Sequence, residues 1–493
     1  MGNKKRMTFN TENLSIVFDL GTTEIKGAVM KNDGTLVQKV TRQNSTKITD
    51  SNHHEQDALF WWEALCSVSK ELCKSYKIQD IVVTGQMQNL LFLNSKGYPL
   101  QEVILYSDQR SIEEAEWLLQ NSCYHNLVVK TGNEQGPTSL VAKLLWIKKH
   151  KPEILSKTKC LLPGASDYIV FRMTGETATD TTTASTTGLM ELVKKKWLDK
   201  ALFDEMGLQG VQTLLPKLYD GGEMIGILQQ NSAKDLGIPA GTPVFLGPGD
   251  AGSATIGAGC GIPGKAYAYI GTSGWAAFSE KQPADPKTGV ITLSHPKCDH
   301  FIQIAPLLTA GGNIEWAKSL SSFESYDSLI NDAISSSLSN LIFLPYLKGE
   351  RSPFVDPKAR GAFIGLQSTT GQSAMNRAVL EGICFSFRHA LTALTETPVK
   401  ELILTGGGTR SEAFCQLFAD VLNVEILVLE EDGAVNMRGA LKSAQGKLDE
   451  SGSFFSATRF TSKGVLKEHY DRLYGAYEAA YPALKSVFST LHQ

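Results

Sequence analysis

Apolar and polar positions along the chain form short blocks that favour an α/β fold. Leu14 to Phe18 and Val244 to Leu246 are short apolar runs typical of buried strands. The segment 57–76 instead carries apolar residues at helical spacing, which predicts an amphipathic helix. Those residues are Leu59, Trp62, Leu65, Val68 and Leu72. Because strand-like and helix-like segments alternate, we expect sheets covered by helices.

The later pattern is more helical and is interrupted by segments of small residues. Residues 111–240 are predicted to be mostly helical, with a loop over the Thr-, Ala- and Ser-rich segment 177–187. The glycine-rich segment 247–264 predicts a domain junction with a short helix. The stretch 431–493 is again predicted to be helical.

One strand-and-turn pattern occurs twice. Asp19-Leu20-Gly21-Thr22-Thr23 and Tyr269-Ile270-Gly271-Thr272-Ser273 each end an apolar run and precede a second strand-like run. The segment 80–85, which ends in Thr-Gly, is likewise matched by 401–406. An internal repeat of this kind constrains the whole fold. It predicts two similar α/β domains with a cleft between them.

Length and composition narrow the class of protein. A chain of 493 residues is too long for one core, and we expect domains at 14–257 and 258–493 after a disordered tail at 1–13. A net charge of −3 gives no support for nucleic-acid or membrane partners, and no apolar run is long enough to span a bilayer. Eight cysteines without a Cys-x-x-Cys pair fit a reducing, cytoplasmic location.

The two repeated turns have the residues that a phosphate needs. Glycine and small hydroxyl residues offer backbone N–H and side-chain O–H donors at close range. Two such turns suggest a nucleotide whose phosphates are held by both halves, although ordinary tight hairpins would have the same composition. Asp19 stands at the end of a strand, where a carboxylate can bind Mg²⁺. Lys26 could reach phosphate oxygens or be an exposed strand lysine.

Two further segments are candidates for the chemistry. Asp250 follows the strand 244–246 between glycines, where it could act as a general base or cap a helix N-terminus. Gly406-Gly407-Gly408 ends a strand and precedes the predicted helix 411–422. Three glycines allow a flat base or a ribose to approach the backbone closely. The segment 310–313 could form a second wall of that pocket.

Three other motifs do not lead to a site. The segment 247–252 matches G-x-G-x-x-G but lacks the acidic residue expected about 20 positions later. The segment 259–265 resembles a P-loop, but Ala266 replaces the required hydroxyl and a strand follows where a helix should begin. His295, Cys298 and His300 match no common zinc spacing, and we expect a solvated turn there.

Taken together, these segments resemble the FGGY carbohydrate kinases, which have an actin-like, ribonuclease H-like fold of two domains. The similarity extends over residues 14–450. It includes both turns, the "DY…TGE" stretch at 167–176 with the "AS-x-x-GL" that follows, and the segment 344–353, Leu-Pro-Tyr-Leu-Lys-Gly-Glu-Arg-Ser-Pro. So many segments in the family's order make the resemblance specific.

The resemblance implies ATP and Mg²⁺ as cofactors, a small sugar as substrate and a homodimer as assembly. It places the catalytic base at Asp250 and the metal-binding carboxylate at Asp19. The implied nucleotide-binding residues are Gly21, Thr22, Thr23, Lys26, Gly271, Thr272, Ser273, Gly311, Glu315, Gly407, Gly408 and Ser411. The implied sugar-binding residues are Gln86, Met87, Gln88, Asp108, Arg110 and Asp250.

Within the family the chain is most similar to the xylulokinases. Their sugar-contacting segments "SGQMHG" and "WNDxR" correspond to 84–89 and 106–110 here, with Gln88 in place of histidine and Tyr106 in place of tryptophan. The expected reaction is phosphorylation of D-xylulose. Because of the two departures, another ketose or a polyol stays open as the substrate. A non-catalytic, nucleotide-binding regulator is the alternative from another class.

Overall fold

The computed structural model describes residues 14–49, 52–296, 299–429, 433–448 and 457–491. They form two compact units. The first unit comprises the described residues of Met1–Gly261, Leu293–Phe301 and Asp432–Phe454, and the second those of Ile262–Thr292, Ile302–Glu431 and Phe455–Gln493. The predicted tail at 1–13 lies outside the described residues. The boundary predicted near residue 258 stays a prediction, since each unit also takes in later segments of the chain.

The first unit is built on a mixed six-stranded sheet with the order β14-β15-β6-β1-β2-β3. It contains both strands and helices, as the hydrophobic pattern predicts, but they do not alternate strictly, because five strands precede the first helix. The elements of this unit are β1 (Leu14–Leu20), β2 (Glu24–Lys31), β3 (Leu36–Gln43), β4 (Lys47–Thr49), β5 (His53–Gln56), α1 (Ala58–Leu72), β6 (Asp80–Gly85), β7 (Leu91–Leu93), β8 (Val103–Ile104), α2 (Ile112–Gln120), α3 (Tyr124–Thr131), α4 (Leu140–His150), α5 (Pro152–Lys157), β9 (Cys160–Leu162), α6 (Ala165–Thr174), β10 (Ala178–Asp180), α7 (Thr181–Ser185), β11 (Met190–Glu191), β12 (Lys196–Trp197), α8 (Lys200–Glu205), η1 (Val211–Leu214), β13 (Lys217–Tyr219), β14 (Glu223–Ile227), α9 (Gln230–Leu236), β15 (Pro243–Leu246), α10 (Asp250–Gly257) and α15 (Val435–Ala444).

The second unit contains a seven-stranded sheet with the order β18-β19-β17-β16-β22-β23-β24. The strand β18 extends into the first unit at its end, and β19 begins there. The elements are β16 (Ala266–Ile270), β17 (Gly274–Glu280), η2 (Pro286–Thr288), β18 (Ile291–Ser294), β19 (Phe301–Leu307), α11 (Gly311–Ser319), α12 (Tyr326–Ser335), β20 (Ile342–Leu344), β21 (Ala362–Ile364), α13 (Gln372–Leu394), β22 (Glu401–Thr405), η3 (Gly407–Arg410), α14 (Glu412–Leu422), β23 (Glu425–Leu429), β24 (Ala457–Phe460), η4 (Gly464–Leu466) and α16 (Lys467–Thr490).

The internal repeat is confirmed at the level of strand register. In the first unit β1 pairs antiparallel with β2 and parallel with β6, so that Asp19 lies opposite both Lys26 and Thr84. In the second unit β16 pairs antiparallel with β17 and parallel with β22. There Tyr269 lies opposite Trp275 and Thr405. The same three-stranded arrangement therefore carries each glycine–threonine turn.

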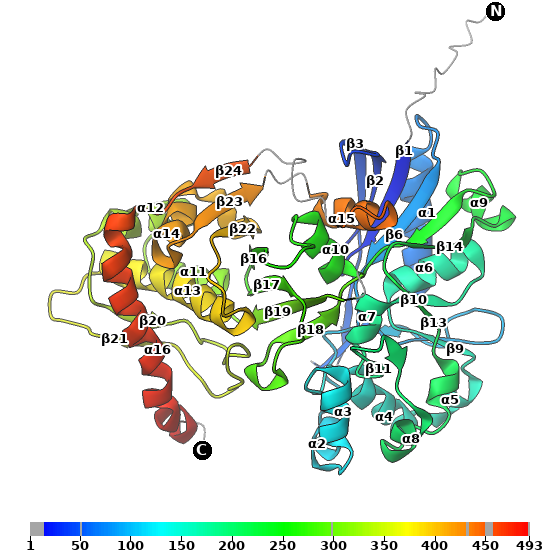
Figure 1. The fold of residues 1–493 in the computed structure, drawn as a ribbon, viewed down its shortest axis with the longest axis horizontal. Coiled ribbons are helices and arrows are strands. Elements are labelled where there is room, and N and C mark those ends of the chain that lie inside the picture. The colour runs from blue at the N-terminus through cyan, green and yellow to red at the C-terminus, as the bar shows by residue number, and fades with distance from the viewer. Residues whose placement is uncertain (1–13, 50–51, 297–298, 430–432, 449–456, 492–493) are drawn as a thin grey trace, which may run out of the picture. The chain divides into compact units, whose positions relative to one another are not determined.

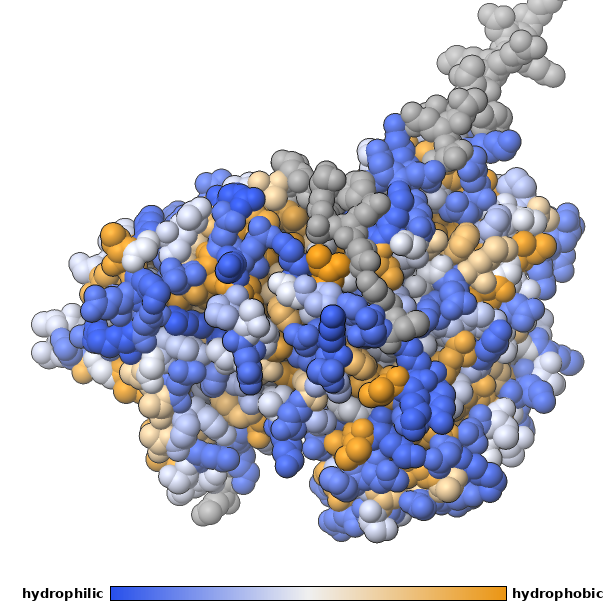
Figure 2. All heavy atoms as spheres, viewed as in Figure 1, coloured by the Kyte–Doolittle hydropathy of each residue, from blue (hydrophilic) through white to orange (hydrophobic). Residues whose placement is uncertain are grey.

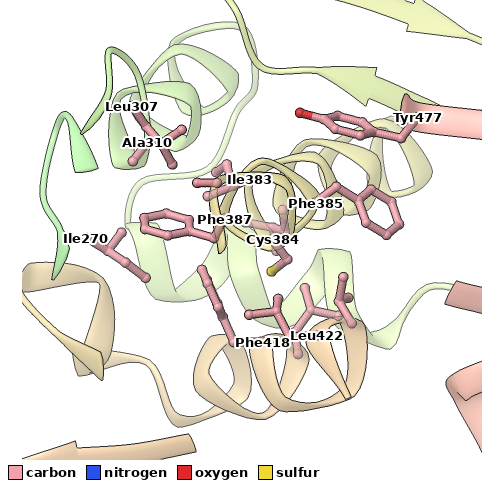
Figure 3. Packing of buried hydrophobic residues seen from close by; sticks show 14 of the residues in the cluster. Ile270, Leu307, Ala310, Ile383, Cys384, Phe385, Phe387, Phe418, Leu422 and Tyr477 are labelled. Carbon is pink, nitrogen blue, oxygen red and sulfur yellow. The ribbon is translucent and has the colours of Figure 1, made fainter. Parts of the chain in front are cut away.

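Each unit has its own apolar core. In the first, α1 and α6 cover one face of the sheet, and α15 packs on β1 and β6 beside α10 (Figure 1). In the second, the central helix α13 places Ile383, Cys384 and Phe387 toward the sheet and toward Phe418 of α14 (Figure 3). Packing against these helices holds each sheet in place, and each sheet carries one glycine–threonine turn at a strand end.

Polar residues cover most of the face in Figure 2, and apolar side chains there form small separate groups. Over the described part of the chain, none of the helices combines the length and the apolar composition that crossing a bilayer requires.

Two predictions of local structure were wrong. The segment 177–187 is not a loop but the short strand β10 followed by the helix α7, and both are buried. The small hydroxyl side chains fit there because they bond to the local backbone; Ser185 Oγ, for example, donates to the Thr182 carbonyl over 2.6 Å. The stretch 431–493 is not wholly helical, since β24 lies between α15 and α16. Periodicity alone does not resolve so short an edge strand.

Candidate active site

Asp19 lies at the carboxyl end of β1, and its surroundings are suited to a cation. The side chain is buried, and Oδ2 accepts a hydrogen bond from Asn436 Nδ2 of α15 at 3.3 Å. Oδ1 is also buried, and no hydrogen-bond donor among the described residues reaches it. Burial raises the pKa of Asp19 to about 6, although Lys26 and Asn436 oppose this. A divalent cation would satisfy the free oxygen and favour the ionised carboxylate.

The turn after Asp19 is held by buried amide side chains of the same unit. Asn44 Nδ2 donates to the Gly21 carbonyl at 3.0 Å, and Gln56 Nε2 donates to the Thr22 carbonyl at 2.7 Å. Gln86 links to the same network, since its Oε1 accepts from Thr22 Oγ1 at 3.1 Å and its Nε2 donates to Gln56 Oε1 at 2.8 Å. The carbonyls of this turn therefore point into the protein and are already bonded.

The predicted phosphate-binding residues of this turn are partly accessible to solvent. Thr23 is exposed, and Gly21 and Thr22 are half-buried. Lys26 is also half-exposed, and its ammonium lies 3.3 Å from a carboxylate oxygen of Glu24. The structure is compatible with Lys26 as an exposed strand lysine and with Lys26 as a phosphate ligand, because an ion pair this exposed is weak and a phosphate could replace Glu24.

Asp250 begins α10 and is half-buried. The predicted alternative of a helix N-cap is wrong, because Gly249 is the N-cap and Asp250 is the first helical residue. Its Oδ1 accepts the backbone N–H of Ala251 at 2.7 Å. Burial raises the pKa of Asp250 to about 7, and the negative charge of Asp19 adds to this shift. Such a carboxyl can accept a proton near neutral pH.

Two neighbours fix the backbone that carries Asp250. A Cβ at position 249 would lie 2.2 Å from Met87 Sδ, so a larger residue there would force the Met87 side chain to shift. On the other side, the buried carboxylate of Asp180 accepts the Gly249 N–H at 3.3 Å, together with the N–H groups of Thr182 and Thr183. Asp180 was not among the predicted site residues. An aspartate before three threonines is a helix-cap signal, which could have located α7 but not its contact with Gly249.

Met87 and Gln88 are half-buried, whereas Gln86 is almost fully buried. Gln88 has a left-handed backbone with φ of 59°, an unusual conformation for a residue other than glycine. The next residue fixes it, because Asn89 N donates to the Pro163 carbonyl at 2.8 Å. Strain of this kind is typical of ligand sites, which agrees with the predicted role of Gln88.

Asp108 and Arg110 form a buried ion pair. Arg110 binds Asp108 through Nε at 2.8 Å and through one terminal nitrogen at 2.7 Å, and that nitrogen also binds Glu55 at 2.7 Å. The Asp108 carboxylate accepts two further N–H groups, from His54 and from Arg110 itself. Burial alone would raise the pKa of Asp108, but the bonds from Arg110 outweigh it and lower the pKa. The pair therefore holds the loop 106–110 in place. Direct contact of either side chain with a sugar stays a prediction.

Lys143 on α4 lies beneath this loop and was not predicted from the sequence. Its side chain is fully buried, and Nζ donates to the carbonyls of Leu105 at 2.6 Å and Tyr106 at 3.3 Å. Burial lowers the pKa of Lys143 to about 7, with Asp108 opposing this and Arg110 adding to it. A lysine within the apolar segment 140–147 was the signal in the sequence.

The pKa of Lys143 leads to a stability prediction. Between about pH 7 and pH 10 the folded chain has released this proton while the unfolded chain keeps it, so the contribution of Lys143 to the free energy of unfolding increases with pH. From pH 7 to pH 9 we expect the free energy of unfolding of the wild type to rise by about 2.3 kcal/mol relative to that of Lys143→Met, since about half of the folded chains still hold the proton at pH 7. Urea unfolding at both pH values measures it. A difference that stays constant would contradict the lowered pKa.

In the second unit, the second turn is bonded to the start of α11. Gly311 N donates to the Gly271 carbonyl at 2.8 Å, and the N–H groups of Ala310 and Gly312 donate to the Thr272 carbonyl. A Cβ at Gly311 would lie 2.6 Å from the Gly271 carbonyl oxygen, so glycine is needed for this contact. The structure thus brings Gly311 to the second glycine–threonine turn. Glu315 lies one helical turn later and is exposed.

The triple glycine follows β22 in the same unit. A Cβ at Gly407 would contact nothing within 4 Å, so this backbone is open to a flat ligand. Gly408 instead packs against Ile270, the residue before the second glycine–threonine turn. Ser411 caps α14, where its Oγ accepts the Phe414 N–H at 3.3 Å. Of the predicted nucleotide-binding residues of this unit, those at 271–273 and 407–411 follow the adjacent strands β16 and β22, and Gly311 and Glu315 lie on α11.

The expectation of a solvated turn at His295 and His300 was wrong. Both side chains are buried, with ring centroids 5.7 Å apart, and His300 Nδ1 lies 2.5 Å from Asp299 Oδ1. The segment packs inside the first unit because Lys195 Nζ donates to the His295 carbonyl at 2.7 Å. Cys298 lies outside the described residues. Among those described, no three His, Cys, Asp or Glu side chains form a group that could hold a metal ion.

Comparison with known proteins identifies the family of this chain. Residues 14–257 match the N-terminal domain and residues 266–444 the C-terminal domain of the FGGY family of carbohydrate kinases. The chain is 33% identical to a xylulose kinase of Escherichia coli over 82% of this chain and 84% of the relative. Its fold is similar to a xylulose kinase and a gluconate kinase of Lactobacillus acidophilus, each with a TM-score of 0.90, 28% identity and coverage of 97% of this chain and 100% of the other. The chain therefore belongs to the FGGY family of carbohydrate kinases.

Proposed function

We propose that the chain transfers a phosphoryl group from ATP to a hydroxyl of D-xylulose, giving D-xylulose 5-phosphate, with Asp250 as the general base. The observation that carries this proposal is the half-buried Asp250 carboxyl, whose pKa of about 7 suits a base at neutral pH. The 33% identity to the Escherichia coli xylulose kinase supports xylulose as the sugar.

The residues present fit ATP and Mg²⁺. Asp19 would hold the cation through Oδ1, the buried oxygen that accepts no hydrogen bond from the described residues. Bound Mg²⁺ offsets negative charge on the phosphates. The open backbone at Gly407 would face the adenosine. The remaining residues proposed for the nucleotide are Gly21, Thr22, Thr23, Lys26, Gly271, Thr272, Ser273, Gly311, Glu315, Gly408 and Ser411. Asp250 would accept the proton of the sugar hydroxyl as that oxygen attacks the terminal phosphate.

The charges around the predicted sugar residues favour a neutral substrate. Within the described residues of this region, the guanidinium of Arg110 is bonded to two carboxylates, and the ammonium of Lys143 is bonded to two carbonyls. Neither of these two groups is therefore free to bind a negatively charged substrate. Met87, which lies against Gly249 next to Asp250, and Gln88 are both half-exposed and can contact a polyhydroxyl compound.

Gluconate is the second candidate substrate, because one of the most similar solved structures is a gluconate kinase. Gluconate carries a carboxylate at neutral pH. Its binding would require Arg110 to exchange Asp108 or Glu55 for the substrate, at the cost of leaving a carboxylate buried without its partner. The ion pair therefore favours xylulose over gluconate.

A substrate screen tests the proposal. We expect ADP release to be fastest with D-xylulose among pentuloses, hexuloses, polyols and gluconate, each assayed at equal concentration with ATP and Mg²⁺. Weak turnover of xylulose beside strong turnover of another compound would overturn the proposed sugar. No sugar-dependent ADP release with any compound would overturn the kinase activity and favour a nucleotide-binding regulator.

The proposed assembly and location have separate tests. We propose a homodimer in the cytoplasm, on the basis of the family resemblance and of the cysteine usage. Light scattering on the full chain measures the first, and cell fractionation measures the second.

A further inference from the structure

The two repeated turns differ in the pair of side chains beneath them. In the first unit the cross-strand pair at the base of the hairpin is Asp19 and Lys26. In the second unit the corresponding pair is Tyr269 and Trp275. The two rings stack with centroids 4.2 Å apart and planes 17° apart. The same backbone arrangement thus carries two charged residues in one unit and two aromatic residues in the other.

A hydrogen bond to a buried tyrosine holds one member of the aromatic pair in place. Trp275 Nε1 donates to the hydroxyl of Tyr267 at 3.2 Å, and Tyr267 is buried in the core of the second unit. Tyr269 and Trp275 are both half-buried. Because stacked rings of this geometry attract each other, Trp275 restricts Tyr269 to one position.

Tyr269 lies as a wedge between two glycine segments. A Cβ at Gly271 would lie 2.7 Å from Tyr269 Cε1, and a Cβ at Gly406 would lie 2.9 Å from Tyr269 Cε2. These two carbons are on opposite edges of the ring. The ring therefore spans the gap between the phosphate turn 271–273 and the triple glycine 406–408.

The first unit has no such wedge. There, a Cβ at Gly21 would meet the Glu24 carbonyl at 3.0 Å, and a Cβ at Gly85 would meet Leu20 at 2.9 Å. The side chain of Asp19, the counterpart of Tyr269, is not among the atoms nearest to either added Cβ. The wedge is thus a property of the second turn and not of the repeated fold.

We propose that Tyr269 is a positioning residue of the nucleotide site, which sets the spacing between the segment that binds the phosphates and the segment that binds the adenosine of ATP. This inference rests on the proposed function, because both segments are assigned to the nucleotide there. A nucleoside triphosphate is a long, flexible ligand whose base and phosphates are separated by the ribose. Two binding segments held apart by a rigid ring are prepared for it before it binds, which lowers the entropic cost of binding.

The glycine at 271 allows a sharp test, since the three atoms nearest to its added Cβ all belong to the Tyr269 side chain. Binding of a non-hydrolysable ATP analogue with Mg²⁺ to the full chain is measured by calorimetry. We expect Gly271→Ala and Tyr269→Ala each to weaken binding by about tenfold. The double variant should bind no more weakly than Tyr269→Ala alone, because the added methyl then has room. Tyr269→Phe keeps the aromatic ring and should therefore bind the analogue with wild-type affinity.

Matched measurements separate positioning from stability. Tyr326→Ala removes an exposed tyrosine from α12 of the same unit and should leave the affinity for the analogue unchanged. In Tyr269→Ala the KM for ATP should rise while the KM for the sugar stays close to that of the wild type, both measured at a temperature where the variant is folded. An equal rise of KM for ATP and for the sugar in Tyr269→Ala would overturn the proposed role of Tyr269. A double variant whose loss of affinity equals the sum of the losses of Gly271→Ala and Tyr269→Ala would overturn it as well. If instead the wild type fails to bind the analogue, the proposed function itself falls.

Discussion

Asp250→Asn is expected to lower kcat by roughly 10²–10⁴-fold, the usual range for the loss of a general base. The amide has the same shape, and its oxygen can still accept the Ala251 N–H, so α10 should begin as in the wild type. It cannot take up the proton of the attacking hydroxyl. The affinity for ATP should be largely kept, because the groups proposed for adenosine lie on the second unit. Steady-state kinetics with the best sugar and calorimetry with an ATP analogue measure both quantities.

Asp204→Asn provides the control for that experiment. Asp204 lies on α8 of the same unit, where its carboxylate pairs with Lys200 at the surface. Its substitution changes the net charge by the same amount and should leave kcat unchanged. If Asp250→Asn turned over sugar as fast as the wild type does, Asp250 could not be the base.

Gly439→Ala is expected to lower the free energy of unfolding by about 3 kcal/mol, at the upper end of the usual cost of overpacking. The helices α10 and α15 cross at Gly257 and Gly439, and a Cβ at position 439 would lie 1.8 Å from the Ser253 carbonyl oxygen. Because this neighbour is backbone, no side-chain rotation can relieve the contact. The helices must move apart, and both lead to the site: α10 begins at Asp250, and Asn436 of α15 binds Asp19. We therefore expect kcat to fall as well. Urea unfolding and kinetics at a temperature where the variant is folded check both effects.

Gly475→Ala is the matched control for the glycine substitution. Gly475 lies within α16, and an added Cβ would meet no atom within 4 Å. Alanine is favoured over glycine in a helix, so this variant should be more stable than the wild type by about 0.5–1 kcal/mol. A Gly439→Ala variant with wild-type stability and kcat would show that the crossing tolerates separation and that the clash does not control the site.

Much of the fold follows from local signals in the sequence. The apolar run before each glycine–threonine turn predicts a buried strand, and the structure confirms both hairpins and their two Thr-Gly strands in matching register. The predicted helix at 57–76 is confirmed as α1, although Leu59 is exposed and Trp61 is the buried residue instead. Such signals involve residues that are close in sequence, where periodicity and turn chemistry act directly.

The residues that were missed act over long sequence separations. Asp180 reaches the N–H of Gly249, Lys143 reaches the carbonyl of Leu105, and Asn436 reaches Asp19. Each is a polar side chain whose partner is set by the tertiary fold, so no spacing in the sequence marks the pair. For the same reason the sequence indicated Asp108 and Arg110 as polar groups but did not reveal that they neutralise each other.

The repeated hairpin also has a consequence for how such a chain can change over evolutionary time. The backbone is alike in both copies, yet one cross-strand position holds a charged pair and the other a stacked aromatic pair. The turn therefore does not depend on the identity of the two side chains beneath it. Mutations at these positions can alter what each half recognises without requiring the sheet to refold, so two copies of one architecture are free to acquire separate chemical tasks.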